Sequence, residues 1–272
     1  MTMFGVHPLD TMIRSADEVA AIPGTTAPKA WPALRQRYEE SLAADDGAAA
    51  QMYAAAVVAG GKDLPQLRVN ALAGVGASSA HAAELNHHVQ AAVYLAAVEM
   101  WKPVAQANLE VIAALFDTAA DELAAAIELV PLGTDIQAVI TADTARREAF
   151  AAHVTMAATL DALAPKLEAA AEMTGATLFT TEYRLPLFVD TTRAHRRHTW
   201  EAFDYPDDGR AGKWGQLTVA AKVRANRNPS SIEPYARPEP VREERRQSPD
   251  GRGFIRVTVD PADIEFQGLV TA

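Results

Sequence analysis

The chain has 272 residues, of which 49% are hydrophobic, and a formal net charge of -10, so it can bury a core without covalent staples. It contains no cysteine, which excludes disulfides, thiolate-bound zinc, iron–sulfur clusters and a thiol nucleophile. No apolar run is long enough to cross a bilayer, and the N-terminus lacks the basic and apolar regions of a signal peptide. We therefore expect no membrane contact and a protein that is cytoplasmic or incorporated into a particle assembled in the cytoplasm.

The charge is distributed unevenly along the chain. Residues 1–176 carry 21 acidic and 10 basic residues, whereas residues 177–272 carry 14 acidic and 15 basic residues. A surface that binds nucleic acid must be basic, because it displaces counterions from the phosphates. The acidic N-terminal part thus disfavours nucleic acid as a partner. The C-terminal part could contact an acidic surface, including the body of another copy.

A helical pattern follows an N-terminal segment, 1–30, and extends over residues 31–175. Alanine, leucine, glutamate and glutamine predominate there, and apolar residues recur at spacings of three and four between short Gly, Pro and Asp breaks. This pattern is typical of an antiparallel helical bundle, so the expected fold class is mainly α. The long helices are predicted at 77–101, 103–130 and 143–173.

Individual residues suggest where these helices begin and bend. Pro103 suits the first turn of a helix, which places a break before it, and Pro165 should kink or divide the helix that contains it. Thr134 and Gln137 have the spacing of a capping box, which predicts a helix that enters at Asp135.

The stretch HAAELNHHVQ, 81–90, is the main candidate for a metal site. On a helix, His81, Glu84 and His88 share one face beside the apolar stripe, and zinc or iron could accept this set of ligands. Di-iron bundles, however, require a second Glu-x-x-His element, and the sequence has none after the one that ends at His87. The competing interpretation is the solvated flank of a helix. His153 is the nearest candidate ligand on another helix.

Other motifs for catalysis or cofactor binding fail on spacing. Gly74 and Gly76 begin a dinucleotide fingerprint, but its third glycine is replaced by Ser79. The chain has no Gly-x-Ser-x-Gly elbow and no His-Glu-x-x-His sequence. We therefore expect no cofactor and favour a protein that is not an enzyme.

The pattern changes in the C-terminal region, 176–272. Segments rich in β-branched and aromatic residues predict strands at 177–190, 215–226 and 253–260. Between the last two, residues 226–253 contain five prolines and dense charge, which predicts an extended arm.

An arginine-rich stretch, TTRAHRRHTW, lies at 191–200 within this region. Its guanidinium groups could bind phosphate or carboxylates, although a solvated helical turn would have the same composition. We expect it to interact with other subunits together with nearby aromatic side chains, through Arg193, Arg196, Arg197, Trp200, Trp214, Tyr235 and Phe254.

Two functional hypotheses remain from the sequence. The first is a structural, interaction protein of a multi-subunit assembly, for example a phage virion component, in which a helical body and an extended C-terminal arm contact other copies or other subunits. The alternative is a helical metal-binding protein or metalloenzyme that uses His81, Glu84 and His88. The sequence favours the first, because it contains the arm but not the remaining metal ligands.

Overall fold

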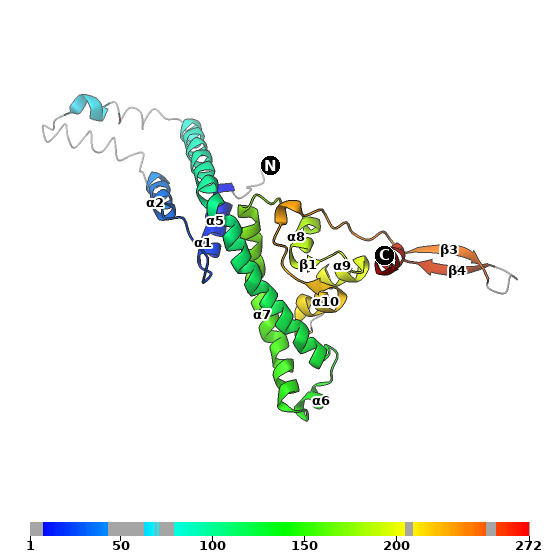
Figure 1. Cartoon of the computed structure of the whole chain (residues 1–272). Coiled ribbons are helices and arrows are strands. Elements are labelled where there is room, and N and C mark those ends of the chain that lie inside the picture. The colour runs from blue at the N-terminus through cyan, green and yellow to red at the C-terminus, as the bar shows by residue number, and fades with distance from the viewer. Residues whose placement is uncertain are drawn as a thin grey trace. The chain divides into compact units, whose positions relative to one another are not determined.

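A computed structural model describes residues 8–42, 63–68, 70, 79–204, 209–248 and 254–271 (Figure 1). The described part is mostly helical and contains two small antiparallel sheets of two strands each, both in the C-terminal region after residue 176. The predicted fold class, mainly α with a small β-containing C-terminal region, is therefore confirmed. Within the described ranges, no helix is long and apolar enough to cross a membrane.

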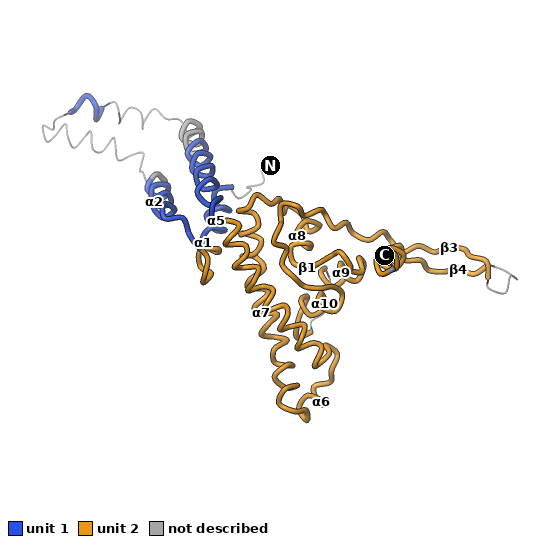
Figure 2. The backbone as a smooth tube through the Cα atoms, in the orientation of Figure 1, with its two compact units in different colours: residues 1–17, 26–104 blue, residues 18–25, 105–272 orange. Residues whose placement is uncertain are grey.

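The chain forms two compact units (Figure 2). Unit 1 comprises residues 1–17 and 26–104, and unit 2 comprises residues 18–25 and 105–272. These limits differ from the predicted domain boundaries at residues 30 and 175. The predicted boundaries concern independent folding, which only a fragment can test, and they stay a prediction.

Aromatic residues hold unit 1 together. Its helices are most of α1 (Pro8–Ala20), α2 (Trp31–Leu42) and the first half of α5 (Ser79–Leu129). The rings of Trp31 and Trp101 meet edge to face with centroids 5.9 Å apart, and both side chains are buried. The guanidinium of Arg35 donates to both carboxylate oxygens of Asp17 at 2.7 Å and so ties α2 to α1.

Pro103 does not separate two helices, contrary to the prediction. A single helix, α5, continues through it for 51 residues. Proline has no N–H to donate to the carbonyl of Glu99, but both residues are exposed, so water can take the place of that donor. The same applies to the exposed Pro165, which does not divide α7 (Thr144–Met173).

Aspartates cap α6 (Ile136–Ile140) and α7, the two helices that follow α5: Asp135 caps α6 and Asp143 caps α7. The carboxylate of Asp135 accepts from the backbone N–H of Gln137 and begins α6. The predicted capping box is therefore wrong, because Asp135 and not Thr134 caps the helix. The Thr134 hydroxyl donates instead to the carbonyl of Pro131. After the C-terminal end of α7, Gly175 has a φ of 93°, a conformation that glycine adopts without strain.

Two of the three predicted strands are mainly helices. Residues 177–190 form α8 (Thr181–Phe188) and only two strand residues, β1 (Val189–Asp190). Residues 215–226 form most of α10 (Gly212–Ala220) and β2 (Lys222–Val223), which pairs with β1. Leu185 to Val189 are all buried, and a short, continuous apolar run fits a buried helix as well as a strand.

An aromatic cluster forms the centre of unit 2. Phe116 of α5, Phe188 of α8 and Trp214 of α10 lie with ring centroids 5.4 to 5.8 Å apart. The indole N–H of Trp214 donates to Asp161 of α7 at 2.7 Å. These contacts join all four helices of the cluster and place α8 and α10 against the α5–α7 pair.

The last elements are α9 (Arg196–Asp204), a 3-10 turn (Pro229–Ser231), β3 (Arg242–Gln247), β4 (Phe254–Val259) and α11 (Pro261–Thr271). The strand predicted at 253–260 is confirmed as β4. It pairs with β3, which lies inside the segment predicted as an extended arm. We refer to residues 232–241 as the arm segment and to the β3–β4 pair as the ribbon.

Candidate functional site

Two adjacent arginines of α9 hold the segment that enters the ribbon and the segment that leaves it. Arg196 donates to Glu265 of α11 at 2.9 Å and to the carbonyl of Ala236 in the arm segment at 3.1 Å. Arg197 donates to both oxygens of Asp260 and to the carbonyl of Glu239 at 2.6 Å. Each arginine therefore joins the residues that enter the ribbon to those that leave it. Such paired donors on carboxylates are among the stronger hydrogen bonds in proteins.

This contact has an electrostatic consequence at Asp260. Its side chain is 14% exposed, and the hydrogen bond from Arg197 lowers the pKa of the carboxyl group from 3.8 to about 2. The same carboxylate accepts from the N–H of Ala262 at 2.9 Å, in the first turn of α11. Asp260 is thus ionised throughout the physiological range and connects α9, β4 and α11.

His195, the residue immediately before α9, makes a further contact with α11. Its Nε2 lies 2.8 Å from the carboxylate of Asp263, and its ring stacks on His198 with centroids 3.9 Å apart. The ring of Phe266 covers it at 5.3 Å. His195 is buried and hydrogen-bonded to Asp263, so its role here is structural.

Aromatic packing fixes the arm segment on the same helix. Trp200 is buried, stacks on the ring of Tyr235 and donates its indole N–H to the carbonyl of Ala236 at 3.0 Å. The guanidinium of Arg237 lies 4.2 Å from the centroid of Trp200. Burial raises the pKa of the Tyr235 hydroxyl above its usual value of 10.0. The arm segment is therefore an ordered part of unit 2.

A proline in α8 provides a further attachment point. Pro186 lies inside α8 and cannot donate to the carbonyl four residues earlier, that of Glu182. The backbone N–H of Tyr235 donates to this carbonyl at 2.9 Å. The missing hydrogen bond of the helix is thus supplied by the arm segment.

The ribbon itself is almost fully exposed. Of its twelve strand residues only Val259 is buried, while Glu244 and Val257 are half-buried. Residues that face each other across an antiparallel pair share one side of it. Because Arg245 pairs with Arg256 and Gln247 with Phe254, these residues lie on one side, together with Glu243 and Thr258.

The two sides of the ribbon carry the same charges, two arginines and one glutamate each. On one side, Glu244 pairs with both Arg242 and Arg246, at 3.4 and 3.0 Å. On the other side, Arg245 and Arg256 are directly opposite each other, and Glu243 pairs with Arg256 at 3.4 Å. Phe254 is 63% exposed next to them, with the Arg245 guanidinium 4.7 Å from its ring centroid.

An open groove lies on unit 2 between α9, α10 and the turn after α5. Its volume is about 640 Å³, and its lining consists of Pro131, Leu132, His198, Glu201, Ala202, Gln216, Val219 and Ala220. Val219 is 69% exposed and Leu132 is 37% exposed. Glu201 is the one carboxylate in this lining, which contains no lysine or arginine. We call this feature the α9–α10 groove.

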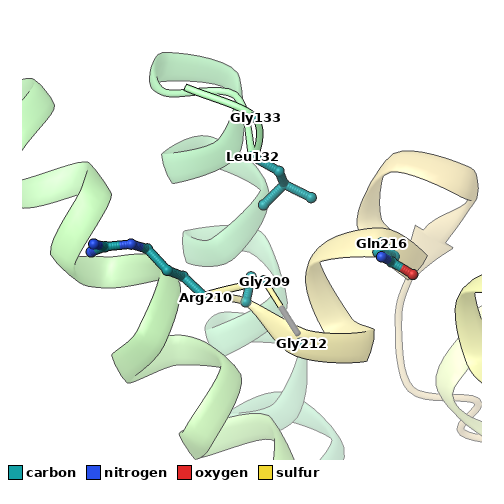
Figure 3. Close-up of a pocket in the computed structure, with 7 residues that line it drawn as sticks. Leu132, Gly133, Gly209, Arg210, Gly212 and Gln216 are labelled. Carbon is teal, nitrogen blue, oxygen red and sulfur yellow. The ribbon is translucent and has the colours of Figure 1, made fainter. Parts of the chain in front are cut away.

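A smaller cavity of about 110 Å³ shares Leu132 and Gln216 with the groove. It lies between the turn at Gly133 and the start of α10 (Figure 3). The side chain of Arg210 extends away from Leu132 in Figure 3, and its guanidinium lies 3.7 Å from the ring centroid of Phe150. Arg210 is the one charged residue in the lining of this cavity.

The predicted interaction residues are only partly at the surface. Arg193 and Phe254 are exposed, whereas Arg196 and Arg197 bond within the chain as described above. Trp200 and Trp214 are buried inside unit 2 and do not form a surface in this conformation. The structure brings Arg196, Arg197, Trp200 and Tyr235 together around the arm segment. Trp214 belongs instead to the aromatic cluster.

The structure describes only one of the three predicted metal ligands, His88. The side chains of His81 and Glu84 lie outside the described residues, and His88 is exposed on α5. His153 is buried on α7, and its Nε2 has no hydrogen-bond partner. Among the side chains that the structure describes, no group of three or more His, Asp or Glu residues could hold a metal ion.

Comparison with known proteins gives no match to a family model, a curated protein or a solved structure. The groove and the division of the ribbon into two sides were not found from the sequence. Which residues share a side of the ribbon follows from the pairing register of β3 with β4. The alternation in residues 254–259 predicted only the β4 strand of that pair. The groove joins residues that are about 70 to 90 positions apart, and no local pattern indicates it.

Proposed function

We propose that this chain is a structural subunit of a multi-copy assembly, such as a virion component, and that the ribbon is the part that contacts neighbouring subunits. The observation that carries the proposal is that both sides and both edges of the ribbon are exposed. The chain segments before and after the ribbon are nevertheless held on α9. A two-stranded ribbon is marginally stable in water by itself, and unpaired strand edges invite pairing with another chain.

The contacts on α9 support this role in a second way. A contact element that is already ordered loses less conformational entropy when it binds, so it gains affinity from its rigid attachment. The hydrogen bonds of Arg196 and Arg197 and the stacking of Trp200 on Tyr235 order the residues before and after the ribbon. Other copies of the chain and other subunits of the same particle are the proposed partners.

The test compares the full chain with a variant that lacks the ribbon. Arg242 and Val259 are paired, so a short Asn-Gly turn can replace residues 243–258 and leave the contacts on α9 in place. Sedimentation velocity should show concentration-dependent association of the full chain and a folded monomer for the variant. A full chain that stays monomeric at high micromolar concentration and recovers no partner from its native source would disprove the assembly role.

A further inference from the structure

The two strands of the ribbon differ in the residues that they place along their free edges. We infer that β4 of one copy pairs with β4 of a second copy in antiparallel orientation, so that the two ribbons form a four-stranded sheet in the order β3–β4–β4–β3. This inference rests on the proposed function and deepens it, because it identifies the contacting strand, its partner and their register.

Both outer edges of the ribbon are unpaired. Among the described residues, the sheet contains only β3 and β4, and neither strand makes a backbone hydrogen bond outside their shared ladder (Figure 1). In a two-stranded antiparallel pair, alternate residues of each strand point their N–H and C=O groups outward. Each edge therefore presents a row of donors and acceptors to which another strand can pair.

Only β3 carries the charges that protect a free edge. Its sequence, REERRQ, contains five charged residues and none that is β-branched or aromatic. The sequence of β4, FIRVTV, contains one charged residue, Arg256, and five that are β-branched or aromatic. Charged side chains keep free edges from pairing, whereas a free edge rich in β-branched and aromatic residues favours association with another strand. The composition of the two strands thus indicates β4 as the contacting edge.

Apolar side chains of β4 are left partly exposed on one side of the ribbon. Ile255, Val257 and Val259 alternate along the strand and so lie on the same side. Val259 is 7% exposed, Val257 is half-buried and Ile255 is 44% exposed, so the apolar surface increases away from α9. A strand that pairs with β4 would cover part of this surface with its own side chains on the same side.

The same three residues make β4 complementary to itself. When two copies pair about Val257, this residue faces the partner's Val257, and Ile255 faces the partner's Val259. Six β-branched side chains then form one apolar strip across the two central strands. A second copy of β4 is therefore the occupant that matches this edge, and a multi-copy assembly supplies it.

The register about Val257 also keeps like charges apart. Arg256 lies opposite the partner's Thr258, and Glu243 of its own copy pairs with it at 3.4 Å. The two Arg256 residues are then diagonal neighbours, about 7–8 Å apart. A register centred on Arg256 would place them directly opposite each other, which destabilises a strand pair. A register centred on Ile255 would pair only residues 254–256 of each described strand, instead of 255–259.

Pairing through β3 is the competing arrangement. In the register that places Arg246 opposite the partner's Glu243, Arg245 lies opposite Glu244, so the charges match. Exposed ion pairs contribute little, however, and Glu244 already pairs with Arg242 and Arg246 of its own strand. Pairing through β4 removes apolar surface from water instead, which is the main favourable contribution to association.

The absence of cysteine from the chain permits a register-specific test. Val257→Cys places the only thiol of each copy opposite that of its partner, within the reach of a disulfide. The matched control is Glu244→Cys, because Glu244 lies directly opposite Val257 on β3 and is also half-buried. After brief oxidation, we expect a dimeric fraction about tenfold larger for Val257→Cys than for the control on a non-reducing gel. Equal crosslinking of the two variants would overturn the inference.

A second pair of variants checks the register itself. Arg256→Cys and Thr258→Cys face each other across the contact, so an equimolar mixture should form the mixed disulfide in preference to either homodimer. Mass spectrometry distinguishes the three products. A mixture in which the homodimers predominate would contradict pairing about Val257.

Val257→Lys tests the contact without a crosslink. It places two lysines directly opposite each other, so we expect the self-association constant from sedimentation velocity to fall about tenfold or more. Gln247→Lys adds the same charge to the exposed β3 strand and should change association by no more than about twofold. Circular dichroism and thermal melting establish that both variants fold.

The outcomes separate this inference from the assembly role. If the full chain associates but Val257→Lys associates equally well, the inference is wrong while the assembly role stands. Association that is lost in Gln247→Lys and kept in Val257→Lys would also overturn it and assign the contact to β3. A full chain that stays monomeric would disprove the assembly role and this contact together.

Discussion

Asp117 is a single buried side chain that joins two distant parts of unit 2. It lies on α5, and its carboxylate accepts from the N–H of Ala225 at 2.8 Å. The guanidinium of Arg227 lies 2.7 Å from the same carboxylate, and that of Arg224 lies at 3.7 Å. A buried carboxylate requires such partners, because desolvation of an uncompensated charge is costly.

Replacing Asp117 should therefore destabilise unit 2. Asp117→Ala leaves the buried N–H of Ala225 without an acceptor, so we expect the free energy of unfolding to fall by about 1–3 kcal/mol. Asp117→Asn keeps an acceptor oxygen but loses the charge, and it should cost less than the alanine variant. Urea denaturation of the three proteins measures the difference. An alanine variant as stable as the original would mean that water replaces the carboxylate.

The low pKa of Asp260 predicts a pH dependence. A carboxyl group with a pKa of about 2 when folded and 3.8 ordinarily stabilises the folded state above pH 4, and this contribution disappears as the pH falls towards 2. The melting temperature of Asp260→Asn should be lower than that of the original chain by a constant amount above about pH 5, and the difference should vanish near pH 2. A difference that does not change with pH would rule out the charged contact with Arg197.

The metal-binding alternative also depends on individual side chains. We expect negligible zinc, iron or manganese in protein purified without chelators, because the sequence lacks a second Glu-x-x-His and His88 is exposed. Elemental analysis of the full chain and of a His81→Ala, His88→Ala variant provides the measurement. One equivalent of metal, lost in the variant, would restore the metal-binding alternative.

At the scale of elements, α10 depends on close approach at one glycine. A Cβ atom on Gly215 would lie 2.5 Å from that of Ala211 and 3.1 Å from Cδ2 of Leu132. Gly215→Ala should therefore shift α10 or the turn at Leu132 and destabilise the protein by about 1–3 kcal/mol, as overpacked cores do. Gly133→Ala is the matched control, since nothing lies within 4 Å of its added Cβ. Equal melting temperatures for the two variants would contradict this packing.

At the scale of the whole molecule, the structure gives a specific expectation for the fragment 31–175. Phe116 is fully buried, but its aromatic partners Phe188 and Trp214 lie beyond residue 175. The fragment should be helical by circular dichroism, yet it should melt with low cooperativity and bind a hydrophobic dye. The ribbon-deleted chain keeps these partners and should melt cooperatively. A cooperative, dye-free fragment would instead confirm the predicted domain boundaries.

The sequence by itself determined the features that depend on local pattern. The helical spacing of residues 143–173 predicted α7 closely, because burial on one face repeats along a helix. The alternation in 254–259 predicted β4, but the expected buried face is absent from this strand, of which only Val259 is buried. The absence of cysteine and the separation of charge along the chain likewise follow from composition alone.

The tertiary structure decided what depends on partners that are distant in the chain. Residues 181–188 and 212–220 became helices because their apolar side chains pack on α5 and α7, which overrides their preference for strands. Arg196 and Arg197 could have met phosphate, another subunit or solvent. They bind Glu265 and Asp260, more than 60 residues away, because folding brings these carboxylates to α9, and long-range proximity leaves no trace in local sequence.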